Sequence, residues 1–255
     1  MIPGETHTRN LKLIVEYDGT DFAGYQTQRQ GLRTVQTVLG EAVGEIMAHP
    51  VLLQAAGRTD TGVHALGQVV SFRTTSAVPT QRLAIALNGK LPRDVAVAAA
   101  EEVDDEFHAR FSAKSRTYGY LVWTRRTRSA IWGRYSLHVR RPLDVNRMRA
   151  EGAALVGTHD FAAYAKMGGS PGPSTVRRLE RLSIRRLSEG RVLFVLTANG
   201  FLRAMVRNIV GALIDVGKGR IDPGTLAMIL NGMDRDANPC APAPAHGLCL
   251  LRVDY

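Results

Sequence analysis

Hydrophobic positions change period several times along the first hundred residues. Alternation with a period of two is typical of a half-buried strand, and recurrence every three or four residues is typical of an amphipathic helix. Thr34 is placed to cap the first helix, and Pro79 precedes the second. The pattern predicts a strand over 11–17, a helix over 34–48, strands over 51–56 and 69–72, a helix over 80–88 and a strand over 95–100. This order is the split βαβ arrangement, in which helices back an antiparallel sheet.

The second half of the chain predicts a similar mixture of elements. Its clearest helix pattern covers 201–217, where apolar residues form one face and Arg203 and Arg207 lie one turn apart on another. Gly211 continues that second face, and because glycine costs a helix about 1 kcal/mol against alanine, we expect another element to approach closely there. The pattern also predicts a strand over 112–123, a helix over 144–155, a flexible connector over 168–173, a hairpin of 179–187 and 191–198 turning at 188–190, a short helix near 222–230 and a final strand over 248–255.

These elements together predict an α+β protein with a largely antiparallel central sheet flanked by helices. The acidic stretch 101–106 is the best candidate for a boundary. We therefore expect an N-terminal α/β half over 9–106 and a C-terminal α/β half over 107–255. At 255 residues the chain is long enough for one large core or two modest ones.

Charge narrows the class of partner. The chain has 33 Lys and Arg against 23 Asp and Glu, a net charge of +10, which favours a polyanion such as nucleic acid. An arginine-rich coding style is the competing explanation, since only five residues are lysines. However, residues 110–149 contain eleven basic residues and one acid, whereas 94–106 contain six acids and no base. A uniform codon bias would not separate the charges in this way.

Other compositional signals are weak. Cys240 and Cys249 lack the spacing of a zinc site, and two cysteines do not form a disulfide framework. Residues 1–10 contain no apolar signal region, and no apolar run approaches the roughly 20 residues of a membrane span. We therefore expect a cytoplasmic protein without a membrane partner.

The most informative segment is Gly-Arg-Thr-Asp-Thr-Gly-Val-His at 57–64. Asp60 lies at a bend between two predicted strands, and Gly57 and Gly62 bracket it. Glycine tolerates positive φ and allows close approach to the backbone, so such a bend presents its carboxylate. Asp and Thr are also ordinary turn formers, and a lone Thr-Asp-Thr-Gly is more often a turn than a site.

Two long segments decide between these interpretations. GRTDTGVHALGQVVSF at 57–72 and ANGFLRAMVRNIVGALIDVGKG at 198–219 resemble the two signatures of the tRNA pseudouridine synthase A family. Phe22–Gln28, Lys114–Tyr120 and Ala243–Leu248 agree as well, so the resemblance spans nearly the whole chain. The chain differs from the usual sequence of this family at two places. Tyr25 stands where tryptophan is more usual, and Pro-Cys-Ala-Pro at 239–242 replaces Gly-Pro-Thr.

The resemblance implies a specific activity. Members of the family isomerise uridine to pseudouridine at positions 38, 39 and 40 of the anticodon stem-loop, without a metal or cofactor. It also implies two halves related to RNA-recognition motifs and ferredoxins, an active-site cleft between them, and a homodimer across which the tRNA lies. The reaction breaks the C1'–N1 bond and joins C5 of the uracil to the ribose, so it needs no redox change.

Residue by residue, the resemblance makes Asp60 the catalytic aspartate, Arg207 its ion-pairing partner and Tyr118 the residue that stacks on the extruded uracil. An ionised carboxylate can act as a nucleophile or as the base for a ribose proton, and both roles stay open. Arg207 directs the carboxylate by bidentate pairing. Tyr118 could instead be a core aromatic of the sheet.

Three further residues have weaker assignments. Arg58 and Arg203 resemble contacts to phosphate or to the flipped nucleotide, although solvated surface charge is an equal alternative. His64 is expected to hold the turn, because this chemistry needs no imidazole. A non-catalytic RNA-binding or RNA-folding protein is the alternative function. Metal-dependent RNA hydrolysis is weaker, since Asp60 and His64 lack partner ligands.

Overall fold

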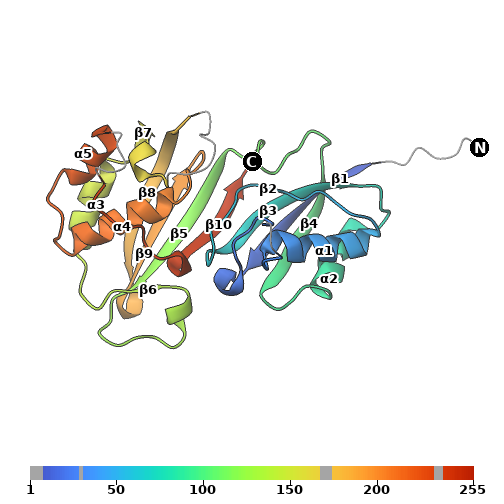
Figure 1. Ribbon diagram of the computed structural model, residues 1–255, viewed down its shortest axis with the longest axis horizontal. Coiled ribbons are helices and arrows are strands. Elements are labelled where there is room, and N and C mark those ends of the chain that lie inside the picture. Colours follow the sequence, from blue (N-terminus) through green and yellow to red (C-terminus); the bar gives the residue numbers. More distant parts are fainter. Residues whose placement is uncertain (1–7, 29–30, 167–173, 233–237) are drawn as a thin grey trace, which may run out of the picture. The chain divides into compact units, whose positions relative to one another are not determined.

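The computed structural model describes residues 8–28, 31–166, 174–232 and 238–255 (Figure 1). The chain forms two compact units, one of Met1–Lys114 with Leu250–Tyr255 and the other of Ser115–Cys249. Strands and helices are mixed in both units, and nearly all strand pairs within them are antiparallel, so the predicted α+β class is confirmed. The expected connector over 168–173 lies outside the described residues.

The first unit combines paired strands with helices α1 and α2, and β1 is antiparallel to both β3 and β4. The strand order is β4-β1-β3-β10, and β2 pairs with β3. Helices α1 and α2 contact each other, and α2 contacts β4 (Figure 1). The elements are β1 (Arg9–Tyr17), a 3-10 turn (Gly19–Asp21), α1 (Val35–Met47), β2 (Gln54–Ala55), β3 (His64–Thr74), α2 (Thr80–Asn88), β4 (Val95–Val103) and the end of β10 (Leu248–Asp254).

Local signals account for most of these bounds. The Thr34 hydroxyl accepts from the Thr37 N–H at 3.2 Å and caps α1, as predicted. The strand expected over 51–56 was wrong in length, because only Gln54–Ala55 pairs with β3. Leu53 is buried in the core, but its neighbour Leu52 is 73% exposed, so the run does not have the burial of a fully covered strand.

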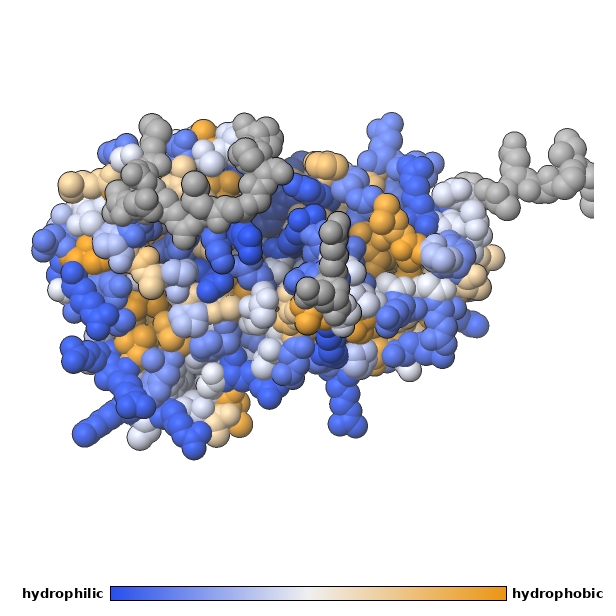
Figure 2. Space-filling model, in the orientation of Figure 1, coloured by the Kyte–Doolittle hydropathy of each residue, from blue (hydrophilic) through white to orange (hydrophobic). Residues whose placement is uncertain are grey.

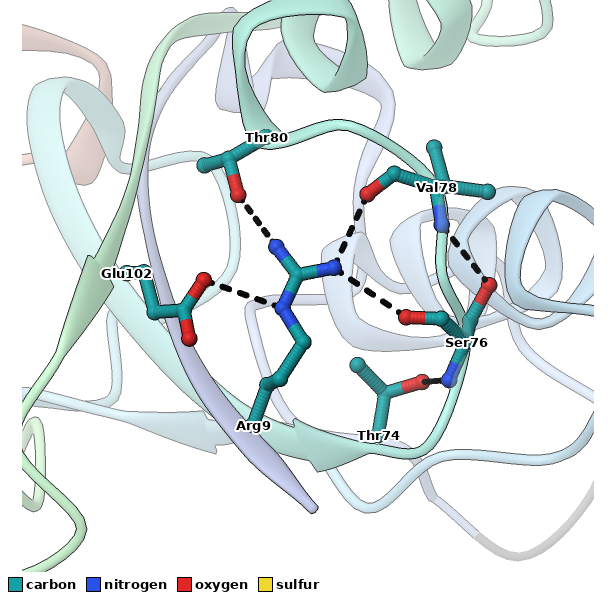
Figure 3. Close-up of polar contacts among 6 residues, drawn as sticks. All are labelled: Arg9, Thr74, Ser76, Val78, Thr80 and Glu102. Atoms are coloured by element: carbon teal, nitrogen blue, oxygen red, sulfur yellow. Dashed lines mark hydrogen bonds and ion pairs between the residues drawn. The ribbon is translucent and has the colours of Figure 1, made fainter. Parts of the chain in front are cut away.

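Arg9 joins three parts of the first unit through its guanidinium (Figure 3). Its Nε lies 2.9 Å from Glu102 Oε2 on β4, and its Nη1 donates to the carbonyls of Ser76 and Val78 at 3.1 and 3.0 Å. Its Nη2 donates to the hydroxyl of Thr80, the first residue of α2. One side chain thereby connects β1, β4 and the segment that enters α2.

Replacement of Arg9 by lysine should destabilise the protein. A lysine has one ammonium nitrogen and cannot reproduce the planar fork that reaches four acceptors. We expect the free energy of unfolding to fall by about 1–3 kcal/mol, measured by urea denaturation. Arg93→Lys, at an exposed position of the same unit, is the matched control and should change it by less than about 0.5 kcal/mol. Equal effects of the two substitutions would contradict the role of Arg9.

The second unit is built on the strand order β5-β9-β8-β7, with β6 parallel to β5. The predicted hairpin is confirmed: β8 and β9 turn at Ser188–Gly190, where Glu189 has a positive φ of 61°. The elements are β5 (Ser115–Trp123), β6 (Leu137–His138), α3 (Val145–Ala153), β7 (Gly157–Asp160), β8 (Val176–Leu187), β9 (Arg191–Ala198), α4 (Met205–Gly217) and α5 (Thr225–Gly232).

Helix α4 begins later than its apolar periodicity predicts. Ala204 has φ 60° and ψ 3°, a left-handed conformation that an α-helix cannot continue through, so the helix starts at Met205. Arg203 therefore lies outside the helix, and the expectation that it shares a helical face with Arg207 was wrong. The close approach expected at Gly211 is confirmed, because a Cβ there would lie 2.1 Å from the carbonyl oxygen of Ala241.

Candidate active site

The bend that carries Asp60 is held by its neighbours in the first unit. The Val63 N–H donates to the Asp60 carbonyl at 3.1 Å, and Gly62 has a φ of 76°. On the other side, the Tyr25 N–H donates to the Thr59 carbonyl at 3.1 Å. Gly24, with φ 101°, leaves room for this contact, since a Cβ there would lie 3.1 Å from the same carbonyl oxygen. Asp60 is half-buried at the centre of this turn.

Side chains beneath the bend anchor it to the sheet. The Thr59 hydroxyl lies 2.8 Å from the hydroxyl of Tyr17 on β1. Gln68 on β3 donates through Nε2 to the Gly57 carbonyl at 2.8 Å. Thr59, Tyr17 and Gln68 are all at most 7% exposed. The backbone on the N-terminal side of Asp60 is therefore fixed to two strands, which restricts the directions in which the carboxylate can point.

His64 contacts residues that follow β1, and its expected role in holding the turn stays a prediction. The side chain is buried, and its Nδ1 accepts from the Gly19 N–H at 3.0 Å. Nδ1 also lies 3.1 Å from Asp18 Oδ1, but a nitrogen that accepts from Gly19 does not donate to Asp18 in the same tautomer. The imidazole thus ties the start of β3 to the 3-10 turn that follows β1.

Tyr25, whose backbone N–H contacts the bend, carries a buried aromatic ring. It is 2% exposed, and its hydroxyl has no hydrogen-bond partner among the described residues. Burial, with a smaller contribution from Tyr17, raises the pKa of Tyr25 far above its ordinary value, so its phenol is neutral. The buried Tyr25 hydroxyl is therefore a polar group without a hydrogen bond among the described residues.

Removal of that hydroxyl should not weaken the protein. For Tyr25→Phe we expect a free energy of unfolding that is unchanged or up to about 1 kcal/mol higher, because a buried unpaired hydroxyl is lost. Tyr120→Phe is the control: the Tyr120 hydroxyl donates to the Pro244 carbonyl at 2.8 Å, so its loss should cost about 1 kcal/mol. Urea denaturation measures both. A clear loss of stability in Tyr25→Phe would show that its hydroxyl has a partner.

Tyr118 lies on β5 in the second unit. Its ring meets that of Phe201 edge to face, with centroids 5.2 Å apart and planes at 89°. Tyr118 pairs in register with Leu196 of β9, and it is 8% exposed. Phe201, in the segment before α4, therefore fixes the orientation of the Tyr118 ring.

Arg207 lies in the first turns of α4 and is half-buried. Its Nε donates to the Ala243 carbonyl at 2.7 Å, and the Ala243 N–H donates back to the Arg207 carbonyl at 2.9 Å. Its positive charge also acts on Tyr120: burial raises the pKa of that phenol, and Arg207 opposes part of the rise. Nothing in the periodicity of the chain had indicated Ala243 or Phe201 as neighbours of these two residues.

Comparison with known proteins identifies the family. The family model described as tRNA pseudouridine synthase matches residues 13–112 and 153–255, which is most of the chain. The chain belongs to the tRNA pseudouridine synthase family.

Individual relatives of this family member match over nearly their full length. A protein named tRNA pseudouridine synthase A from Thermoanaerobacter sp. (strain X514) is 41% identical over 247 residues, which cover 97% of this chain and 100% of the relative. Proteins of the same name from Chlorobium luteolum and Roseiflexus sp. (strain RS-1) are each 45% identical, and the matches cover 97% of this chain and 96% and 91% of those relatives.

The five residues assigned from the resemblance are divided between the units of this family member. Arg58 and Asp60 belong to the first unit, and Tyr118, Arg203 and Arg207 belong to the second. Arg58 and Arg203 are exposed, and the Arg203 carbonyl accepts from the Lys166 N–H at 2.9 Å. Both guanidinium groups can therefore reach a bound polyanion, whereas Tyr118 is largely enclosed by protein.

The described parts of the chain contain neither a metal-binding cluster nor a membrane-spanning helix. Over these residues, no group of three His, Cys, Asp or Glu side chains is arranged to hold a metal ion. None of the helices there has both the length and the apolar character that crossing a membrane requires.

Proposed function

We propose that this protein isomerises uridine to pseudouridine in tRNA, that it acts at positions 38, 39 and 40 of the anticodon stem-loop, and that Asp60 is the catalytic carboxylate. Membership of the family supports the reaction and the substrate. The observation that carries the assignment of Asp60 is its place on a bend whose backbone is anchored to β1, to β3 and to the loop of Tyr25. A carboxylate in such a fixed frame is preoriented for chemistry.

The reaction sets clear demands on Asp60. The glycosidic bond between C1' and N1 breaks, the uracil turns over, C5 bonds to C1', the C5 proton leaves, and N1 gains a proton. An ionised carboxylate starts this sequence either as a nucleophile or as the base that removes a ribose proton. Both routes need a carboxylate that lies close to the ribose and is shielded from competing water.

Arg207 and Tyr118 complete the proposed site. Because Arg207 Nε donates to Ala243, its two Nη nitrogens are the donors suited to a carboxylate, in a bidentate arrangement. In this proposal Tyr118 stacks on the extruded uracil and takes part in the loss of the C5 proton. Stacking of about 1–3 kcal/mol offsets part of the cost of taking a base out of the stem.

Exposed arginines in the second unit support a nucleic-acid substrate. The face of the protein drawn in Figure 2 is largely hydrophilic, with separate hydrophobic patches. The loop between β5 and α3 is rich in exposed arginines that can contact phosphates, in addition to Arg58 and Arg203. These loop residues are Arg125, Arg126, Arg128, Arg134, Arg140 and Arg141.

The wider organisation is also part of the proposal. We infer two functional halves, 9–106 with Asp60 and 107–255 with Tyr118 and Arg207, each of the split βαβ kind. The order β1-α1-β2-β3-α2-β4 of the first unit supports this arrangement. We further infer that the protein is cytoplasmic and that it forms a homodimer. Sedimentation of the purified protein would test the dimer.

Unmodified tRNA transcripts test the function directly. Three transcripts should each carry a single uridine at position 38, 39 or 40, with cytidine at the other two positions. We expect pseudouridine at each of these uridines, mapped chemically, and equal yields with and without a metal chelator. Binding without any altered base would favour the alternative of a non-catalytic RNA-binding protein. Pseudouridine at other positions would instead overturn only the assigned site of action.

A further inference from the structure

Residues 241–247, here called the C-terminal strap, cross one face of α4 within the second unit. Ala243 is 3% exposed and exchanges two hydrogen bonds with one residue of the helix: its N–H donates to the Arg207 carbonyl, and its carbonyl accepts from Arg207 Nε. A backbone segment thereby holds both the main chain and the guanidinium of the same arginine.

Gly211 makes this crossing possible. It follows Arg207 by four residues and so lies one turn along the same helical face. A Cβ at Gly211 would lie 2.1 Å from the Ala241 carbonyl oxygen and 3.1 Å from the Ala243 nitrogen. Neither atom belongs to a flexible side chain, so the strap would have to move if residue 211 were larger.

Tyr120 holds the other end of the strap. It is fully buried on β5, and its hydroxyl donates to the Pro244 carbonyl at 2.8 Å. Gly247 packs against the same ring, since a Cβ there would lie 2.7 Å from Tyr120 Cζ. The strap is therefore fixed at three points, Gly211, Arg207 and Tyr120, which come from a helix and a strand.

We propose that the C-terminal strap positions Arg207, and that Gly211 and Tyr120 are positioning residues that act through it. The bond from Nε to Ala243 sets the rotation of the guanidinium plane, which determines where the two Nη nitrogens point. This inference rests on the proposed catalytic role of Arg207 and goes beyond it, because it assigns a function to residues that do not contact the substrate.

Gly211→Ala tests the inference, with Gly40→Ala as the matched control. Both glycines lie within helices, but a Cβ at Gly40 would meet only Leu53 Cδ1, at 3.8 Å. We expect Gly211→Ala to lower the single-turnover rate of pseudouridine formation at least tenfold, with a tRNA dissociation constant within twofold of wild type. Gly40→Ala should leave both unchanged. Thermal unfolding of each variant shows whether it is folded at the assay temperature.

Tyr120→Phe provides a second test without steric conflict. If Gly211→Ala does not fold, this second variant tests whether the strap positions Arg207. Loss of the bond to Pro244 should lower the rate about threefold to tenfold and leave tRNA binding unchanged. A folded Gly211→Ala or Tyr120→Phe protein with the wild-type rate would overturn the role of the strap.

A double variant separates this inference from the proposed function. If the strap acts through Arg207, Gly211→Ala should slow an Arg207→Lys protein by no more than twofold. Multiplicative effects of the two substitutions would overturn the inference and leave the role of Arg207 intact. A wild-type rate in Arg207→Lys alone would instead remove the catalytic role of Arg207, and the inference with it.

Discussion

Asp60→Asn is expected to bind tRNA as tightly as the wild-type protein and to form essentially no pseudouridine. The amide has nearly the same shape as the carboxylate but is neither a nucleophile nor a base, so the loss should be about 10⁴-fold or more. Binding should survive, because phosphate contacts supply most of the affinity for a nucleic acid. Single-turnover assays and filter binding with the same transcript measure the two quantities.

Asp105→Asn is the control for this prediction, since Asp105 is an exposed aspartate of the same unit and lies outside the proposed site. It should retain the wild-type rate. Turnover by Asp60→Asn within tenfold of wild type would remove Asp60 from the mechanism. If Asp60→Asn also lost tRNA binding, the carboxylate would have a structural role in the bend.

Arg207→Lys should produce the next largest effect. Lysine keeps the positive charge but lacks both the fork of two Nη donors and the Nε donor that bonds to Ala243. A charge-assisted hydrogen bond is worth about 1.5–3 kcal/mol, so we expect the rate to fall about 10-fold to 150-fold. tRNA affinity should change little, because the charge is preserved. Rapid-quench measurement of a single turnover gives the rate.

Arg220→Lys is the corresponding control. Arg220 lies just beyond the end of α4, is exposed, and contacts Asp215 at 3.3 Å through a single nitrogen. A surface pair of this kind contributes little, so its replacement by lysine should leave the rate unchanged. Equal losses of the single-turnover rate in Arg207→Lys and Arg220→Lys would indicate that replacing any arginine affects tRNA binding in general. They would not indicate a specific role of Arg207 in catalysis.

Elements with strong local signals were predicted closely. The helix after Pro79 was expected over 80–88 and is observed as Thr80–Asn88. The hairpin turn at 188–190 was also located correctly, since Ser-Glu-Gly there is a turn-forming sequence between two strand patterns. In both places, the backbone preferences of adjacent residues agree with the final fold.

Two errors show where local reasoning fails. Apolar periodicity extended α4 back to residue 201, but because Ala204 has a left-handed conformation the helix begins only at Met205. The apolar run 51–56 was assigned entirely to a strand, but Leu52 is exposed and only two residues pair. Pairing and burial depend on partners distant in the sequence, which periodicity does not specify.

The sequence by itself determined the mixed strand and helix content, the bend at Asp60, the capping of α1 by Thr34 and the family resemblance. It also indicated close approach at Gly211, because a glycine inside a helix has an energetic cost. Only the tertiary structure decided that the C-terminal strap makes this approach, and that Ala243 bonds to Arg207. Propensities and caps act between near neighbours, whereas this hydrogen bond joins residues 36 positions apart and forms only when the chain is folded.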